Sequence, residues 1–194
     1  SMTEKSIFLG GFMCSGKTSV GKSLSARLGW TFIDTDDMIE ERAGMPVGQI
    51  FQHLGEPAFR ALEYSAVTDA LKGKMQVVSL GGGALVNEEL RNMILSHARL
   101  VILDVRPETV LARARGETRP RPLLEKGNVP ALMEKRRGAY ALCHIRVATD
   151  EFSVSSVADR ILTDLREGSS LSGTDRSREP EEIPSSQPWS PALV

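Results

Sequence analysis

The sequence predicts a three-layer α/β fold in which helices cover both faces of a parallel sheet. Short apolar runs alternate with longer segments of helical periodicity from residue 6 to residue 167, and this alternation is typical of parallel sheets. A second observation is a glycine-rich segment, residues 11–18, that matches GxxxxGK[ST] in full between a predicted strand and a predicted helix. Both observations indicate a P-loop α/β domain.

The predicted elements follow one another in a regular order. The strands are residues 6–10, 31–34, 76–80, 99–105 and 145–149. The helices are residues 17–28, 36–44, 47–54, 57–72, 87–96, 107–115, 130–143 and 154–167. The first helix shows the reasoning: Val20, Leu24 and Leu28 recur every four residues, and Gly29 is a typical helix-ending residue.

Length and composition predict one domain with a tail. Of 194 residues, 41% are apolar and 25% charged, with a net charge of -1, so global charge does not indicate binding to nucleic acid or to an anionic membrane. Residues 1–167 are the predicted domain. Residues 168–194 are rich in Ser, Pro and charge, and we expect a disordered tail there.

Other sequence features concern the cellular compartment. Cys14 and Cys143 lie far apart and form no CxxC, so neither zinc nor a disulfide framework is indicated. There is no apolar run of about 18 residues and no visible signal peptide, so we expect no membrane span and a cytoplasmic location.

The glycine-rich segment carries the chemistry of a phosphate cradle. Glycines let successive backbone N–H groups turn toward one anion, and the amino end of the next helix adds a positive partial charge. Lys17 is expected on the β- and γ-phosphates of ATP and Thr18 on Mg²⁺. Cys14 lies inside the loop; it is either a reactive thiol or, the reading we favour, a small residue that fits there. The residues expected on the nucleotide here are Gly11, Cys14, Ser15, Gly16, Lys17, Thr18 and Ser19.

Carboxylates follow the second predicted strand as Asp34, Asp36 and Asp37. Asp34 is a candidate ligand of Mg²⁺, directly or through water, because the strand at 76–80 ends without a carboxylate. Asp36 is a candidate base for a substrate hydroxyl. One of these residues could instead cap the next helix. Asp37 is expected to interact favourably with the dipole of that helix, because it lies in the first turn.

Arginines supply a second set of candidates. Arg60 has Glu63 three residues later on a predicted helix, which is either a surface pair or a carboxylate clamp oriented by Glu63. The turn Gly81-Gly82-Gly83 allows a close approach by a ligand. The Pro-rich segment 116–128, with Arg119 and Arg121, is either a solvated loop or a mobile lid that brings an arginine to the phosphates.

These segments together resemble the shikimate kinases over roughly residues 5–167. The matching segments, in the order of the family, are GFMCSGKT, DTD at 34–36, GEPAFRALE at 55–63, SLGGGA at 79–84, RPLL at 121–124 and KRRGAY at 135–140. The resemblance implies a nucleoside-monophosphate-kinase-like fold with a five-stranded parallel sheet, a substrate-binding helical region and a lid, in a protein that is usually monomeric.

The resemblance also implies a reaction and roles. The reaction is phosphoryl transfer from ATP, with Mg²⁺, to the 3-hydroxyl of shikimate on the chorismate route to aromatic amino acids. Catalytic roles are implied for Lys17, Asp36 and Arg121, and metal binding for Thr18 and Asp34. Substrate contacts are implied for Asp36, Arg60, Gly81, Gly82, Gly83 and Arg136, and further nucleotide contacts for Arg113, Arg115 and Arg121. The segment DEFSV at 150–154 departs from the family, because it lacks the proline expected beside the adenine.

Two alternative functions remain open from the sequence. Another P-loop kinase, such as a gluconate kinase, would share the cradle but would not need two arginines for a carboxylate. A non-catalytic nucleotide-binding module would tolerate the loss of Asp36 or Arg121, and both are present.

Overall fold

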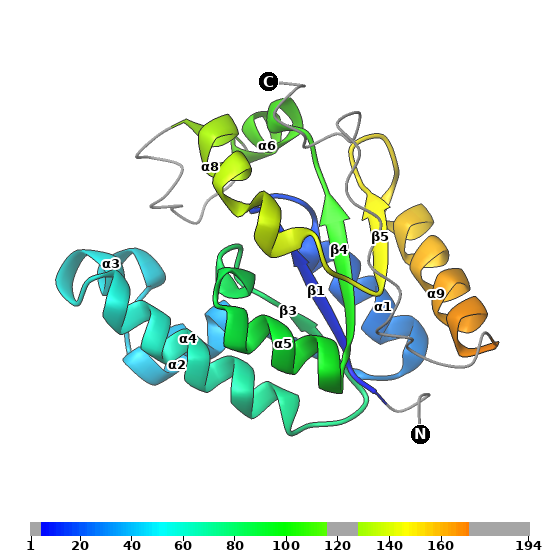
Figure 1. Ribbon diagram of the computed structural model, residues 1–194, viewed down its shortest axis with the longest axis horizontal. Coiled ribbons are helices and arrows are strands. Elements are labelled where there is room, and N and C mark those ends of the chain that lie inside the picture. The colour runs from blue at the N-terminus through cyan, green and yellow to red at the C-terminus, as the bar shows by residue number, and fades with distance from the viewer. Residues whose placement is uncertain (1–4, 116–127, 171–194) are drawn as a thin grey trace.

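The sheet has five parallel strands in the order β2-β3-β1-β4-β5 (Figure 1). The computed structural model describes residues 5–115 and 128–170. The strands are β1 (Ile7–Gly11), β2 (Thr31–Asp34), β3 (Gln76–Ser79), β4 (Arg99–Asp104) and β5 (Ile145–Ala148). The predicted α/β fold class is therefore confirmed. Arg119 and Arg121, with most of the predicted lid, lie outside the described residues, as does the chain beyond residue 170.

Helices cover both faces of this sheet. They are α1 (Lys17–Leu28), α2 (Thr35–Ala43), α3 (Val47–His53), α4 (Glu56–Leu71), α5 (Glu88–His97), α6 (Pro107–Ala114), α8 (Val129–Arg136) and α9 (Val154–Ser170). The described residues also form two 3-10 helices, η2 (Ala84–Val86) and η3 (Arg137–Tyr140). Helices α1 and α9 pack together on one face, and α5 lies on the other (Figure 1).

Alternating side chains divide the core between the two faces. On β4, Val101 and Leu103 belong to the cluster that contains residues of α1 and α9. Leu100 and Ile102 on the same strand belong to the cluster with residues of α4, α5 and α8. Because successive side chains of a strand point to opposite faces, a strand with two buried faces needs an unbroken apolar run. On β4, which is buried along its full length, residues 100–103 form that apolar run between Arg99 and Asp104.

Helices α2, α3 and α4 form a helical region beside the sheet, with a small core of its own (Figure 1). Ile39, Ile50, Phe59 and Ala66 are buried in it. This region projects from the edge of the sheet at which β2 lies, since α2 begins directly where β2 ends. It therefore places α4 next to the end of β2.

Some element boundaries differ from the predictions. The expected helix over 130–143 is the α-helix α8, which ends at Arg136, followed by the tighter turn η3. Gly138 disfavours a continued α-helix by about 1 kcal/mol relative to alanine, and the tighter turn brings the Tyr140 hydroxyl to the Gly82 carbonyl. At the other end of the domain, α9 continues to Ser170, three residues past the expected end at residue 167.

The carboxyl ends of β1, β2 and β3 meet at one edge of the sheet. Asp34 at the end of β2 pairs with Ser79 at the end of β3, and the Leu80 N–H donates to the Leu9 carbonyl at 3.0 Å. The segments 11–18, 34–36 and 81–83, which the sequence placed after three strands, therefore lie together.

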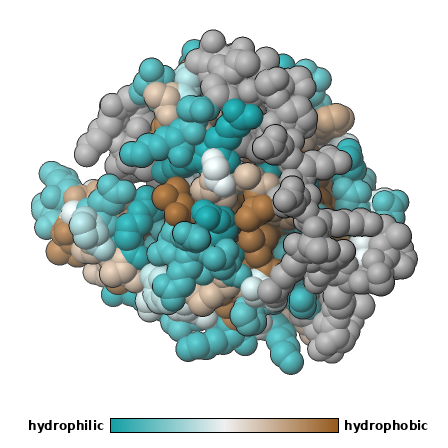
Figure 2. All heavy atoms as spheres, viewed as in Figure 1, coloured by the Kyte–Doolittle hydropathy of each residue, from teal (hydrophilic) through white to brown (hydrophobic). Residues whose placement is uncertain are grey.

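The surface of this view is largely hydrophilic, with hydrophobic residues in smaller groups among the described atoms (Figure 2). Among the described residues, no helix is long and apolar enough to cross a membrane.

Candidate active site

The phosphate cradle joins the end of β1 to the start of α1. Gly11 has a φ of 137°, and a Cβ atom there would lie 2.5 Å from the Leu103 carbonyl oxygen. Only glycine fits both conditions, so the loop can begin its turn against β4. Gly16, with a φ of 103°, is the N-cap residue directly before α1. The Lys17 ammonium lies within the same loop, where it donates to the Gly11 carbonyl at 2.6 Å and to the Phe12 carbonyl at 3.0 Å.

A cavity of about 350 Å³ opens beside the cradle. Residues 13–20 line one side of it, and the ends of β2 and β3 line the other with Asp34, Asp36 and residues 79–82. The predicted phosphate loop and the predicted carboxylates thus share one cavity. A volume of this size is typical of a small-molecule site.

Asp34 and Asp36 reach that cavity in different ways. Asp34 caps α2, because its Oδ1 accepts the Asp36 N–H at 2.8 Å and the Asp37 N–H at 3.3 Å. The capping alternative therefore applies to Asp34, which also lines the cavity. Asp36 and Asp37 both lie in the first turn of α2. Asp37 is exposed, which agrees with a role limited to a favourable interaction with the helix dipole.

The Gly81-Gly82-Gly83 turn brings the predicted substrate-binding residues together. A Cβ atom on Gly81 would lie 2.8 Å from Oδ1 of Asp36, and one on Gly83 would lie 2.7 Å from a guanidinium nitrogen of Arg60. A Cβ atom on Gly82 would lie 3.1 Å from Nη1 of Arg136. The absence of side chains in this turn is what allows these charged groups to converge.

The Arg60–Glu63 pair is not a simple surface pair. Nη1 of Arg60 donates to Oε1 of Glu63 at 2.7 Å, and the Glu63 side chain is only 2% exposed. Burial raises the pKa of Glu63, while Arg60 opposes that rise, Asp36 adds to it and Arg136 also opposes it. A buried carboxylate that fixes a guanidinium beside the glycine turn fits the clamp interpretation.

Arg136 is buried, and its contact with the Phe12 ring was not predicted from the sequence. Its guanidinium carbon lies 5.4 Å from the centre of the Phe12 ring, a cation–π contact that joins the cradle to α8. Its Nη1 is buried and finds no hydrogen-bond acceptor among the described residues. A buried guanidinium nitrogen of this kind favours an anionic ligand.

Tyr140 is a site residue that sequence reasoning missed. Its hydroxyl donates to the Gly82 carbonyl, and burial raises its pKa. The signal in the sequence is its place in the KRRGAY segment, four residues after Arg136.

The far end of the cavity is formed by residues around the end of β5. Arg113, Thr149, Phe152 and Val154 line it. Phe152 stands in the segment where the proline was expected and is 60% exposed. Arg115 is exposed after the end of α6 and is not among the lining residues. Thr149 was missed, although it follows a strand at the same edge as the predicted carboxylates.

The residues present fit a magnesium ion carried by a nucleotide. The Thr18 hydroxyl and the Asp34 carboxylate line the same cavity and are hard oxygen donors. Among the described residues, no group of three or more His, Cys, Asp or Glu could hold a metal ion. Two protein ligands suit Mg²⁺, which keeps several waters and substrate oxygens in its shell.

Comparison with known proteins gives the family. Residues 13–166 match the family model described as "Shikimate kinase". This chain belongs to the shikimate kinase family. The chain is 42% identical to the shikimate kinase of Moorella thermoacetica over 163 residues, which are 82% of this chain and 94% of that protein.

Solved structures agree with this family. The shikimate kinase from Acinetobacter baumannii in complex with shikimate matches with a TM-score of 0.80 and 30% identity, over 86% of this chain and 95% of that one. The shikimate kinase from Aquifex aeolicus matches with a TM-score of 0.75 and 38% identity, over 87% and 99% of the two chains. Membership in this family favours the shikimate kinase interpretation over the gluconate kinase and non-catalytic alternatives.

Proposed function

We propose that this enzyme transfers the γ-phosphoryl group of ATP to the 3-hydroxyl of shikimate, which gives shikimate 3-phosphate and ADP. The observation that carries the proposal is the convergence of Asp36, Arg60 and Arg136 on the glycine turn beside the phosphate cradle. Shikimate offers one carboxylate and several hydroxyls, so it needs both cationic and acceptor groups. The acceptor group, Asp36, lies beside Gly81 at one end of the glycine turn, and the two arginines lie toward its other end, beside Gly82 and Gly83.

The acceptor is held by both kinds of group. Arg60, oriented by Glu63 at 2.7 Å, and Arg136 bind the carboxylate, because paired guanidinium groups suit that planar anion. The glycine turn, residues 81–83, supplies close backbone contact. Asp36 accepts hydrogen bonds from the ring hydroxyls and thereby aims the 3-hydroxyl at the cradle.

The transfer itself is one displacement at phosphorus. The 3-hydroxyl oxygen forms a bond to the γ-phosphorus while the bond from that phosphorus to the β,γ-bridging oxygen breaks, and ADP leaves with the bridging oxygen. Asp36 takes the hydroxyl proton. Lys17 and the N–H groups of the cradle offset the charge on the phosphate oxygens.

Other residues of the site would bind the nucleotide or its magnesium ion. Thr18 and Asp34 would hold Mg²⁺, which neutralises phosphate charge when bound. Arg113 and the segment around Phe152 border the end of the cavity at which the base would lie. Arg121, outside the described residues, is proposed as a lid arginine on the phosphates. We propose further that the enzyme works as a cytoplasmic monomer.

The test is an ADP-release assay of the full chain with ATP and Mg²⁺. Shikimate, gluconate and nucleoside monophosphates are compared as acceptors at equal concentrations. We expect ADP release that depends on shikimate alone, with shikimate 3-phosphate identified by mass. Turnover with gluconate but not with shikimate would overturn the proposal, and ATP binding without any acceptor-dependent turnover would favour the non-catalytic module.

A further inference from the structure

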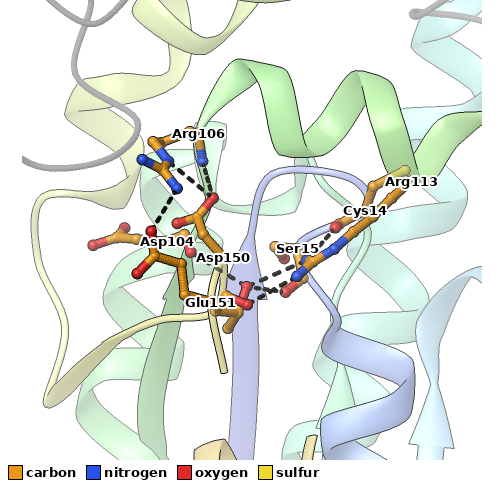
Figure 3. A network of polar contacts seen from close by, with 8 residues as sticks. Cys14, Ser15, Asp104, Arg106, Arg113, Asp150 and Glu151 are labelled. Atoms are coloured by element: carbon orange, nitrogen blue, oxygen red, sulfur yellow. Dashed lines mark hydrogen bonds and ion pairs between the residues drawn. The ribbon is translucent and has the colours of Figure 1, made fainter. Parts of the chain in front are cut away.

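A polar network joins the phosphate cradle to the end of β5 (Figure 3). The Thr149 hydroxyl donates to the Ser15 carbonyl at 2.7 Å. Arg113 reaches across from α6, where Nη1 donates to the Cys14 carbonyl and Nη2 to the Thr149 carbonyl, both at 2.8 Å. Two successive carbonyl groups of the cradle, those of Cys14 and Ser15, therefore accept hydrogen bonds from half-buried or buried side chains.

Thr149 is itself held firmly. Its backbone N–H donates to the Asp104 carbonyl at 3.0 Å, which continues the pairing of β5 with β4. The residue is 3% exposed. Its hydroxyl also accepts from Nη1 of Arg113 at 3.3 Å. The hydroxyl is thus fixed by the sheet on one side and aimed at the loop on the other.

The cradle needs such support because its backbone conformation is not one that the loop residues prefer. Cys14 has a φ of 61°, in the left-handed region that side chains with a Cβ atom seldom adopt. Conformations of this kind persist where the surrounding structure holds them. The Ser15 N–H closes a turn onto the Phe12 carbonyl at 3.2 Å, which fixes one end of the loop.

The direction of the Ser15 carbonyl decides the direction of the next N–H group. No cis peptide bond occurs among the described residues, and a trans peptide points its C=O and N–H to opposite sides. Because the Thr149 hydroxyl holds the Ser15 carbonyl toward the end of β5, the Gly16 N–H points away from β5. Ser15 and Gly16 line the cavity beside the cradle, and Arg113 and Thr149 line its end near β5.

We propose that Thr149 is a positioning residue for nucleotide binding, which acts through the Ser15 carbonyl to preset the Gly16 N–H for a phosphate. Arg113 braces the preceding peptide group in the same way, in addition to any contact it makes with the base. The inference rests on nucleotide binding by the family and does not depend on the identity of the acceptor.

The test compares three variants of the full chain. Thr149→Val removes the hydroxyl and keeps the shape, Thr149→Ser keeps the hydroxyl, and Thr163→Val makes the same change on the exposed side of α9. The dissociation constant of ADP with Mg²⁺ is measured by calorimetry, and the KM values for ATP and for the acceptor by the ADP-release assay.

We expect Thr149→Val to weaken ADP binding and raise the KM for ATP by about tenfold, because the loop loses a buried hydrogen bond. The KM for the acceptor should stay within about twofold, Thr149→Ser should restore most of the affinity, and Thr163→Val should match the wild type. Should Thr149→Val fail to fold, Thr149→Ala takes its place with the same expected result.

Three results would overturn the proposal. One is wild-type ADP affinity in Thr149→Val. Another is a loss that Thr149→Ser does not restore, since shape rather than the hydroxyl would then matter. The last is an equal rise in both KM values, which indicates general loosening of the domain. Because the calorimetry needs no acceptor, it also separates this proposal from the proposed reaction.

Discussion

In the phosphate cradle, residues 11–18, the groups proposed to bind the nucleotide are backbone N–H groups of one continuous loop, with the side chains of Lys17 and Thr18. On the acceptor side, at the glycine turn whose Gly81 and Gly82 line the same cavity, the proposed ligand groups are side chains from separate segments of the chain. Asp36 follows β2 and Arg60 lies on α4, while Arg136 ends α8. The cradle can therefore be recognised from eight consecutive residues, whereas the acceptor side exists only once the chain has folded.

The two regions also differ in how their charge is managed. The cradle uses peptide dipoles and the amino end of α1, with one lysine held on its own loop carbonyls. The acceptor side gathers ionised side chains at low exposure, with Glu63 at 2% and Arg136 at 4%. Because buried charges are costly unless they are paired, each of these side chains needs a partner. Because the groups proposed to bind the nucleotide lie in residues 11–18, changes at Asp36 or Arg60 should alter acceptor binding or chemistry and leave nucleotide binding intact.

The largest effect is expected at Asp36. Asp36→Asn keeps the size of the side chain but removes the base, so kcat should fall by about a hundredfold or more. The dissociation constant of ADP should not change, because the groups proposed to bind the nucleotide belong to residues 11–18 and not to Asp36. Steady-state kinetics and calorimetry measure the two quantities. Asp37→Asn, on the exposed neighbour, is the matched control and should keep wild-type kcat. An unchanged kcat in Asp36→Asn would mean that positioning alone carries the step.

A smaller effect is expected at Arg60. Arg60→Ala removes one half of the carboxylate clamp and leaves Glu63 buried without its ion pair. Loss of a charged hydrogen bond costs about 1.5–3 kcal/mol, so the KM for shikimate should rise by about tenfold to a hundredfold, while the KM for ATP stays constant. Initial-rate kinetics with each substrate varied in turn measure this difference.

Arg42→Ala provides the control for Arg60→Ala. Arg42 lies in the same helical region and pairs with Asp69 at 2.8 Å, away from the glycine turn. It should leave both KM values near those of the wild type. An Arg60→Ala effect confined to ATP would contradict the clamp assignment.

The sequence predicts the continuous cradle better than it predicts features that depend on the folded chain. The alternation of strands and helices predicts the fold class. The cradle can be recognised from the sequence because a loop of backbone donors needs glycines at fixed spacing. The strand order β2-β3-β1-β4-β5 was not predicted, since it depends on crossovers that local patterns do not record. Asp34 shows a further limit: a cap and a metal ligand have the same sequence signature, and the structure shows the cap.

Residues that contact the backbone of the site were harder to predict. Thr149 and Tyr140 touch backbone carbonyls of segments 134 and 58 positions away. A lone threonine or tyrosine has no motif of its own, so only the folded chain reveals which carbonyl it meets. The polar residue at the end of β5 could have been suspected from the rule that ligands lie beyond the carboxyl ends of parallel strands.

The smallest effect concerns the buried carboxylate of the clamp. Burial raises the pKa of Glu63 above its ordinary value of 4.5, although Arg60 opposes the rise. The folded chain then holds the Glu63 proton more tightly than the unfolded chain. This contribution to the free energy of unfolding is complete below pH 4.5 and is lost as the pH rises through the folded-state pKa.

Glu63→Gln removes this titration, so its free energy of unfolding should fall less than that of the wild type as the pH rises from about 4.5 toward neutrality. Urea unfolding over that range measures the two slopes, with Glu41→Gln on the exposed side of α2 as the matched control. The direction is opposite to that of an ordinary surface ion pair, which gains stability as its carboxylate ionises. A steeper fall in Glu63→Gln than in the wild type would mean that the attraction of Arg60 outweighs burial, so that ionisation of Glu63 stabilises the folded acceptor side.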